Sequence, residues 1–433
     1  MNKQTSKLNP PNQSARVWRT VCVAAMSALI VVSVVLAAVA CSSIFASNRD
    51  YAAKGAQLFT VSDLGDYDDD STKCRVEFTS ADGNYSYFHT YTYEEWEELP
   101  ENADGYNETV GPHTTVTGHI FETPDGTYAV FAPEHRSADS PLPTAAEIRA
   151  ALRTARTLNA APLLNAAMAV ALAAIGFAIM AFAGKHFTTY EKCWFLSIMV
   201  LAAIFAVIFP EEDVNGVNGL IIMALYLADT LLNILCELLI SKQSKWNFIV
   251  SVFVEITEIA ICLVLAYRFA TMISTLFFWL PIDIISFINW NKHPDRAEDE
   301  LTQVRRMRGW QEILVLVGIA VWTVGIGYLL TLMDFGTDLF HGNEALYIAV
   351  CYLDACVTAV GIANGLFIFF RFEEQWFAWI LDAVLEGVIN ILSGQFVLLV
   401  LKAGYLTNST YGYIKWRKYI KTHPELAQKK SFF

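Results

Sequence analysis

Long apolar runs recur along most of this chain, and they restrict its fold more than any other feature. About ten of them approach the ~20 residues that a helix needs to cross a bilayer. The last three follow one another closely, at 346–370, 376–392 and 395–416. Because 55% of all residues are apolar, so many runs are hard to reconcile with a soluble fold. We therefore predict an all-α polytopic membrane protein.

Charges in the loops between the runs predict their orientation. The seven earlier runs lie at 21–40, 163–183, 195–209, 220–240, 248–267, 272–288 and 313–333. Short cytoplasmic loops collect Lys and Arg. Loops 184–192, 241–245 and 291–308 and the tail at 415–430 carry them, whereas loops 210–216 and 333–344 are acidic. We therefore expect ten spans in the plasma membrane, with both termini cytoplasmic.

A polar segment, 47–140, interrupts the apolar runs. Two turn sequences, ADGN at 81–84 and PDG at 124–126, lie between strand-like stretches, which predicts two hairpins in a small sheet of four or five strands. Residues 47–156 hold 20 acidic residues against 8 Lys and Arg, so about −12 of the net charge of −13 lies there. The acids at 66–70 lack EF-hand spacing, and we favour a solvated loop over a metal site.

The first run determines where this acidic segment goes. We favour an uncleaved anchor at 21–40 over a cleaved signal peptide or a lipoprotein signal that ends before Cys41. Each alternative places residues 47–155 outside the cell. The chain then divides into a cytoplasmic N-terminus with the first span (1–46), an extracytoplasmic β-rich domain (47–140), a helix leading into the second span (141–189), a core of about eight spans (190–420) and a cytoplasmic tail (421–433).

Acidic side chains and aromatic rings occur inside the last three runs. Asp354, Asp382 and Glu386 all lie within apolar sequence. A carboxylate at the bilayer centre costs at least ~2.5 kcal/mol, so each one indicates a partner, a wet cavity or a ligand. Trp379, Asp382 and Glu386 are spaced three and four apart and share one helix face. Rings beside acids suit a cationic aromatic solute.

Two motifs in the same region resemble a known family. EEQWFAWILD at 373–382 and NSTYGYIKW at 408–416, together with Asp354 and the basic loop after INWNKHPD at 288–295, are similar to the PnuC nicotinamide riboside transporters over roughly residues 190–420. The resemblance implies a facilitative carrier that takes up this NAD precursor. It also implies a SWEET-like core of three helices, one linking helix and three more.

A weak internal repeat fits that core. KQSKWNF at 242–248 echoes EEQWFAW, and IDIISFINW at 282–290 echoes NSTYGYIKW. Three spans, the linking span 313–333 and three more give both triplets the same orientation, which is the parallel-repeat case. The spans before residue 220 and the β-rich domain are then additions to the 3+1+3 core.

The substrate that the resemblance implies has a flat pyridinium ring, a carboxamide and a ribose. Such a ligand needs ring faces and a few amide or carboxylate groups. Asp283 is a further acid beside these candidates. We expect the substrate-binding residues to be Trp376, Trp379, Asp382, Glu386, Asn408, Tyr411, Asn247, Glu255, Trp279 and Asp354.

Other functions remain as alternatives. The same fold could carry thiamine or another flat vitamin, and a sensor or assembly protein could use the exported domain. We find no nucleotide-binding, protease or hydrolase motif, so we expect no enzyme activity, no cofactor and no nucleic-acid partner. The expected partners are the solute and the bilayer, with a homo-oligomer and a surface nucleotidase bound to residues 47–140 as further hypotheses.

Overall fold

The computed structural model describes residues 13–66, 73–92, 95–96, 115–135, 142–241, 244, 246–292, 307–333, 339–340, 343–370 and 372–422. These residues form two compact units, one made of 1–34 with 165–433 and the other of 35–164. The second unit is longer than the domain expected at 47–140 because its boundaries fall inside helices α1(Gln13–Ile44) and α3(Ala145–Ala183).

The unit at 35–164 contains a five-stranded sheet. Its strands are β1(Ala52–Asp66), β2(Lys73–Ser80), β3(Ser86–Thr92), β4(Thr115–Glu122) and β5(Tyr128–Phe131). They are ordered β3-β2-β1-β4-β5, and every neighbouring pair is antiparallel. Both predicted hairpins, β2–β3 and β4–β5, are present. Strand alternation buries Cys74, Val76 and Phe78 against Phe59 and Ile120, as expected for a sheet with one covered face.

Helix α3 packs against the end of this sheet. A capping box begins it, because Glu147 Oε2 accepts from the Thr144 amide at 2.7 Å and the Glu147 amide donates to Thr144 Oγ1 at 3.3 Å. One turn further, Ile148 packs with Ala129 of β5. Arg156 is buried and donates to both carboxylate oxygens of Asp125, at 2.8 and 2.9 Å, which ties the β4–β5 turn to the helix.

Two histidines of this unit stack on each other. The rings of His89 on β3 and His135 in the short helix η1(Pro133–His135) lie 3.8 Å apart and nearly parallel. The hydroxyl of Tyr91 lies 2.5 Å from His135 Nε2, and that of Tyr87 lies 3.3 Å from Nδ1. Burial, with a smaller effect of His89, lowers the pKa of His135 to about 4, and burial also lowers the pKa of His89.

Acid is therefore expected to destabilise this sheet. Because the folded-state pKa of His135 is below the ordinary 6.5, the unfolded chain binds more protons than the folded chain between about pH 6.5 and 4. The contribution of neutral His135 to the free energy of unfolding is therefore complete above pH 6.5 and is lost as the pH falls toward 4. Hydrogen exchange of β2 and β3 peptides in the full-length protein, corrected for intrinsic rates, should rise at pH 4.5 relative to pH 7. His135→Phe should weaken this rise and His119→Phe should leave it intact; an equal rise in both variants would contradict the prediction.

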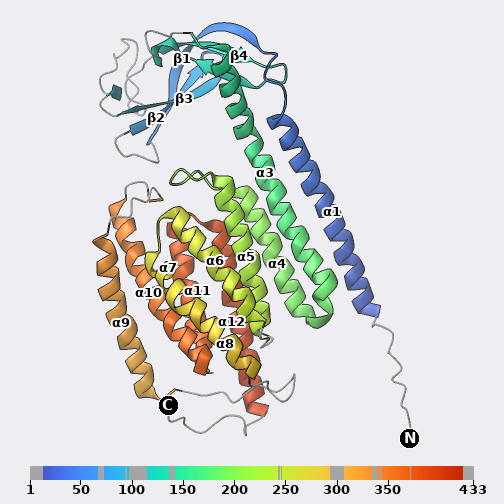
Figure 1. The fold of residues 1–433 in the computed structure, drawn as a ribbon, viewed down its shortest axis with the longest axis vertical. Helices are drawn as coiled ribbons and strands as arrows, with labels where there is room; N and C mark the ends of the chain where they lie inside the picture. Colours follow the sequence, from blue (N-terminus) through green and yellow to red (C-terminus); the bar gives the residue numbers. More distant parts are fainter. Residues whose placement is uncertain are drawn as a thin grey trace. The chain divides into compact units, whose positions relative to one another are not determined.

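The larger unit is helical. In addition to parts of α1 and α3 it contains η2(Gly184–His186), α4(Thr189–Ile208), α5(Gly219–Ser241), α6(Asn247–Leu265), α7(Phe269–Ser274), the π-helical turn η3(Thr275–Trp279), α8(Leu280–Lys292), α9(Gly309–Thr331), α10(Glu344–Phe370), α11(Gln375–Leu392) and α12(Phe396–Thr422). Figure 1 shows these helices as a bundle in which α7, η3 and α8 form one continuous rod.

Membrane-spanning character was expected for ten helices and is found for nine. Within the described ranges, nine helices are long and apolar enough to cross a bilayer, with α7 to α8 counted as one. The tenth expected span is present as α12, 27 residues long, but it is not among the nine. Polar residues, including Lys402 and Asn408, lower the mean hydropathy of this helix. The bundle accommodates them because the helix faces other helices and a cavity.

Small residues allow the helices of this bundle to approach one another. The ring of Trp376 on α11 lies where a Cβ of Gly412 would be, and Ile234 of α5 takes the equivalent space at Gly404. A hydrogen bond of 2.9 Å from Trp194 Nε1 to Thr407 Oγ1 joins α4 to α12. Helix α12 therefore lies inside the bundle, against α4, α5 and α11, which is the close packing typical of membrane helices.

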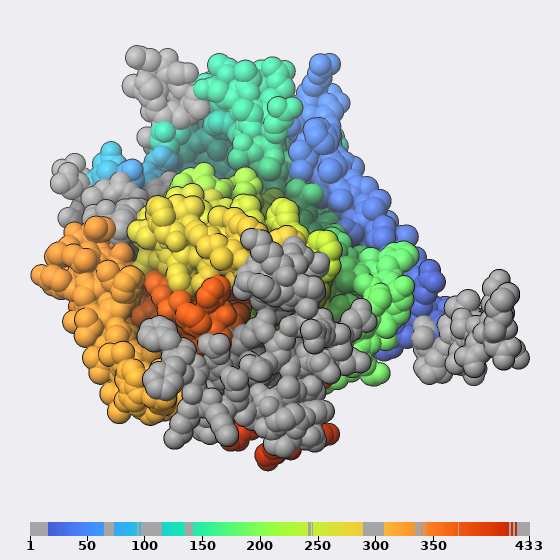
Figure 2. All heavy atoms as spheres, turned by 60° about the horizontal axis from the view of Figure 1, so that its bottom comes forward, coloured from blue at the N-terminus to red at the C-terminus, as the bar shows by residue number. Residues whose placement is uncertain are grey.

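Helix α9 lies at the edge of this unit, beside α10 (Figure 2). Its outer surface is apolar, and more than half of each side chain is exposed at Ile313, Leu316, Val321 and Val324. Exposing so many apolar side chains to water would be unfavourable. A helix that is apolar on its outer side is what lipid covers. In the chain it lies between the helices α5 to α8 and the helices α10 to α12.

Candidate functional site

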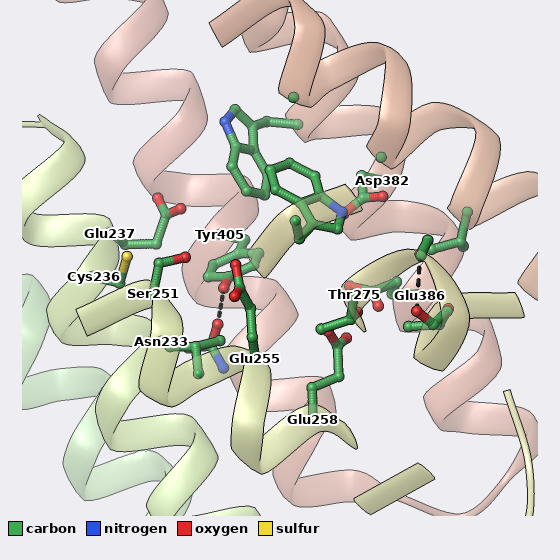
Figure 3. A pocket seen from close by; sticks show the side chains of 18 of the residues that line it. Asn233, Cys236, Glu237, Ser251, Glu255, Glu258, Thr275, Asp382, Glu386 and Tyr405 are labelled. Atoms are coloured by element: carbon green, nitrogen blue, oxygen red, sulfur yellow. Dashed lines mark hydrogen bonds between the residues drawn. The ribbon is translucent and has the colours of Figure 1, made fainter. Parts of the chain in front are cut away.

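A cavity of about 200 Å³ lies within the helical unit. Its walls come from α5, α6, α7 to α8, α10, α11 and α12, so both groups of three helices contribute. One buried water needs only ~10–15 Å³ measured in the same way, and the cavity therefore has room for a small solute. Its lining combines rings, carboxylates and amides (Figure 3).

Helix α11 presents one polar face to this cavity. Trp379, Asp382, Glu386 and Asn390 follow one another at intervals of three, four and four, and all line the cavity. The predicted line of ring, acid and acid therefore faces inward rather than outward. The Trp379 ring meets the Tyr405 ring of α12 edge-on, with centroids 5.6 Å apart. Asn390 is fully buried, and neither side-chain amide atom has a hydrogen-bond partner among the described residues.

Glu386 lies between two cations. Arg268, which immediately precedes α7, donates to one of its oxygens, and the ammonium of Lys402 on α12 pairs with the other. Lys402 also lies over the ring of Tyr405, 4.8 Å from its centroid. Both carboxylate oxygens are thus occupied by positive groups, which offsets much of the cost of burying this charge.

Some of the other acids around the cavity accept hydrogen bonds from neutral groups. Thr257 Oγ1 donates to Asp229 at 2.7 Å, and Thr275 Oγ1 donates to Glu258 at 2.8 Å. Figure 3 shows Glu237, Glu255 and Glu258 around the same space as Asp382 and Glu386. Along the described part of the lining, seven carboxylates face two cations; the carboxylates are Asp229, Glu237, Glu255, Glu258, Asp283, Asp382 and Glu386. The excess of acid favours a positively charged solute.

The link between α6 and α7 forms part of the cavity wall, through Tyr267 and Arg268. Ala266 and Arg268 both have positive φ, 49° and 54°, a conformation that non-glycine residues hold only when their surroundings impose it. Asp354 of α10 holds the residues that follow, because it accepts from the Ala270 amide at 2.9 Å and from Thr271 Oγ1 at 2.5 Å, with Arg268 Nε at 3.7 Å. A second cavity of about 20 Å³ is lined by Arg268 and Asp354.

The structure brings together seven of the ten expected substrate-binding residues. Those that line the larger cavity are Trp376, Trp379, Asp382, Glu386, Asn247, Glu255 and Trp279. The other three lie elsewhere. Asn408 donates to Glu237 Oε2 at 2.6 Å and so positions a lining residue, Tyr411 stacks on Tyr190 with centroids 4.4 Å apart, and Asp354 holds the start of α7.

Arg268 and Lys402 were not among the expected residues. Lys402 had a clear signal in the sequence, because an ionisable residue in the middle of an apolar run usually has a function or a partner. Arg268 had a weaker one, since it falls in the break between two runs. Nothing in the sequence indicated that both would meet the same carboxylate.

A polar, acid-rich cavity among apolar helices, with room for a small solute, is typical of a multi-pass membrane protein with a polar site in its core. A family model described as nicotinamide mononucleotide transporter matches residues 223–418. The nicotinamide riboside transporter PnuC of Neisseria mucosa is 25% identical over 251 residues, covering 54% of this chain and 84% of that protein. The corresponding protein of Haemophilus influenzae is 23% identical over 240 residues, covering 54% and 91%.

A solved structure, titled as the crystal structure of the vitamin B3 transporter PnuC, aligns with 23% identity, 55% of this chain, 94% of its own and a TM-score of 0.41. Together the family model and the two sequence relatives show that the helical core of this chain is similar to PnuC-type nicotinamide riboside transporters. The matched segment contains α6 to α11 in full and most of α5 and α12.

Proposed function

We propose that this protein is a facilitative transporter that takes up nicotinamide riboside through the cavity between the two groups of three helices. The observation that carries the proposal is the cavity lining, in which indole and phenol rings stand beside an excess of carboxylates. Two relatives bear the name nicotinamide riboside transporter. A pyridinium ring gains roughly 0.5–2 kcal/mol from each cation–π contact.

The polar groups of the cavity suit the remainder of this solute. A ribose offers hydroxyl donors and acceptors, and a carboxamide offers one acceptor and two donors. The amide of Asn390 is buried and lacks a partner within the described structure, so it is available to such a group. Because an unpaired buried amide costs about 1–3 kcal/mol, a ligand that satisfies it gains affinity.

The proposed arrangement in the membrane follows from the loop charges. Both termini lie in the cytoplasm and residues 47–155 lie outside, with α5 to α8 and α10 to α12 as parallel repeats joined by α9. The acidic sheet domain is then an accessory whose charge disfavours anionic nucleotides within the ~8–10 Å over which charge acts in salt. A surface nucleotidase that releases riboside would be a suitable partner for it.

Purified protein in liposomes should take up labelled nicotinamide riboside with saturation, and the uptake should stop at equal internal and external concentrations because the carrier is passive. Unlabelled riboside should compete fully and unlabelled thiamine weakly. Liposomes without protein are the control. Absence of saturable uptake of riboside would refute riboside transport, whereas saturable uptake of labelled thiamine in the same liposomes would keep the carrier and change its solute.

A further inference from the structure

The ammonium of Lys402 makes both contacts that a cationic aromatic solute would need in this cavity. It pairs with Glu386, and it lies over the face of Tyr405 at 4.8 Å. A carboxylate and a ring face are the two groups that recognise an organic cation. The lysine side chain is 11% exposed and itself lines the cavity, so it lies at the space that the solute would enter.

We propose that Lys402 is a tethered cation that occupies the cation subsite of the empty carrier and is displaced by the solute. This inference rests on the proposed function, since it takes the solute to be positively charged. It adds a specificity-determining residue: a solute enters this subsite only by replacing Lys402 at Glu386 and Tyr405, and only a solute with its own positive charge leaves both groups paired.

The ion-pair geometry permits this exchange. Glu386 keeps Arg268 when Lys402 withdraws, because the two cations approach different carboxylate oxygens. Asp382 lies one turn before Glu386 on the same face of α11 and also lines the cavity, which gives the displaced ammonium a second carboxylate within the same wall. The buried carboxylate is therefore never without a positive partner.

Removing the tethered cation should tighten binding of a cationic solute. Lys402→Met is expected to bind nicotinamide riboside roughly 3- to 30-fold more tightly, which is the range for one cation–π contact. The uncharged dihydro form of the riboside should change less than about twofold, because it cannot replace the ammonium at Glu386. Binding would be measured by titration calorimetry on purified full-length protein.

A matched control exists on the same helix. Arg417 also lies over a tyrosine ring, 5.3 Å from the centroid of Tyr413, and near a carboxylate, 3.8 Å from Glu373, but its side chain is 57% exposed. Arg417→Met should leave both affinities unchanged. Lys402→Gln is the second variant. It removes the positive charge but keeps a polar group beside Glu386, so it serves as the test if Lys402→Met does not fold.

The alternative to displacement is a general effect of charge on the cavity. If the ammonium and the solute compete for the ring of Tyr405, then in a Tyr405→Leu background the gain in riboside affinity from Lys402→Met should be largely lost. If only the net charge of the cavity matters, the gain should be kept in full, and that result would overturn the proposal. Unchanged or weaker riboside binding in both Lys402 variants would also overturn it. If the wild-type chain binds thiamine but no riboside, the proposed function fails, and the same comparison with thiamine still tests the lysine.

Discussion

Arg268→Met is expected to destabilise the helical unit by about 3–5 kcal/mol, the usual cost of removing one partner from a buried ion pair. The side chain of Arg268 is only 5% exposed and is shared by Glu386 and Asp354. Its removal leaves Asp354 without a cation, although the amide donors of Ala270 and Thr271 remain. The positive φ of residue 268 then has less to hold it.

Thermal unfolding of the purified protein in detergent measures this effect, and the apparent Tm should fall by roughly 6–20 °C. The double variant Arg268→Met with Asp354→Asn should recover part of the loss, because the uncompensated charge is gone. Arg417→Met is the surface control, for which less than ~1 kcal/mol is expected. A wild-type Tm for Arg268→Met would mean that the buried network contributes little to stability.

The sequence was sufficient for the features that depend on local pattern. Apolar runs predicted the helices, and the ADGN and PDG turns predicted both hairpins, because helix formation in a membrane and tight turns are controlled by nearby residues. The inward line on α11 was also predictable, since Trp379, Asp382 and Glu386 share a face by their spacing alone.

Features that depend on how distant helices meet were not predictable in this way. Tyr411 was expected at the site because it belongs to the motif NSTYGYIKW. It follows Tyr405 by six residues, which at ~100° per residue turns it about 240° around the helix, so it stacks on Tyr190 of α4 instead. Only the packing of α12 against α4 determines which of its faces meets the cavity.

The ion pairs of Glu386 also depend on how helices that are distant in the sequence meet. Arg268 precedes Glu386 by 118 residues in the chain, and no local rule connects them. The sequence placed several acids inside apolar runs but did not indicate which cations would meet them. With Arg268 and Lys402 present, the cavity keeps an excess of carboxylates but already contains its own positive groups. Under the displacement proposal, a cationic solute therefore competes with these internal positive groups for the carboxylates.

Trp379→Ala is expected to reduce riboside uptake by roughly 5- to 150-fold, the range measured when a ring that stacks on a flat base is removed. Trp379 lines the cavity from α11 and contacts Tyr405, so its loss removes one ring face from the solute and loosens the other. Initial uptake rates into liposomes, with the amount of inserted protein measured in parallel, test this directly.

Two further variants make the result specific to that ring. Trp379→Phe keeps an aromatic face and should retain much more uptake than the alanine variant. Trp310→Ala removes an indole of α9 that is 60% exposed and outside the cavity lining, and uptake should stay near the wild-type rate. Because Trp379→Ala leaves Glu386, Arg268 and Lys402 in place, the protein should still insert and fold. Wild-type uptake in that variant would move the aromatic subsite to Trp376 or Trp279, the other indoles that line the cavity.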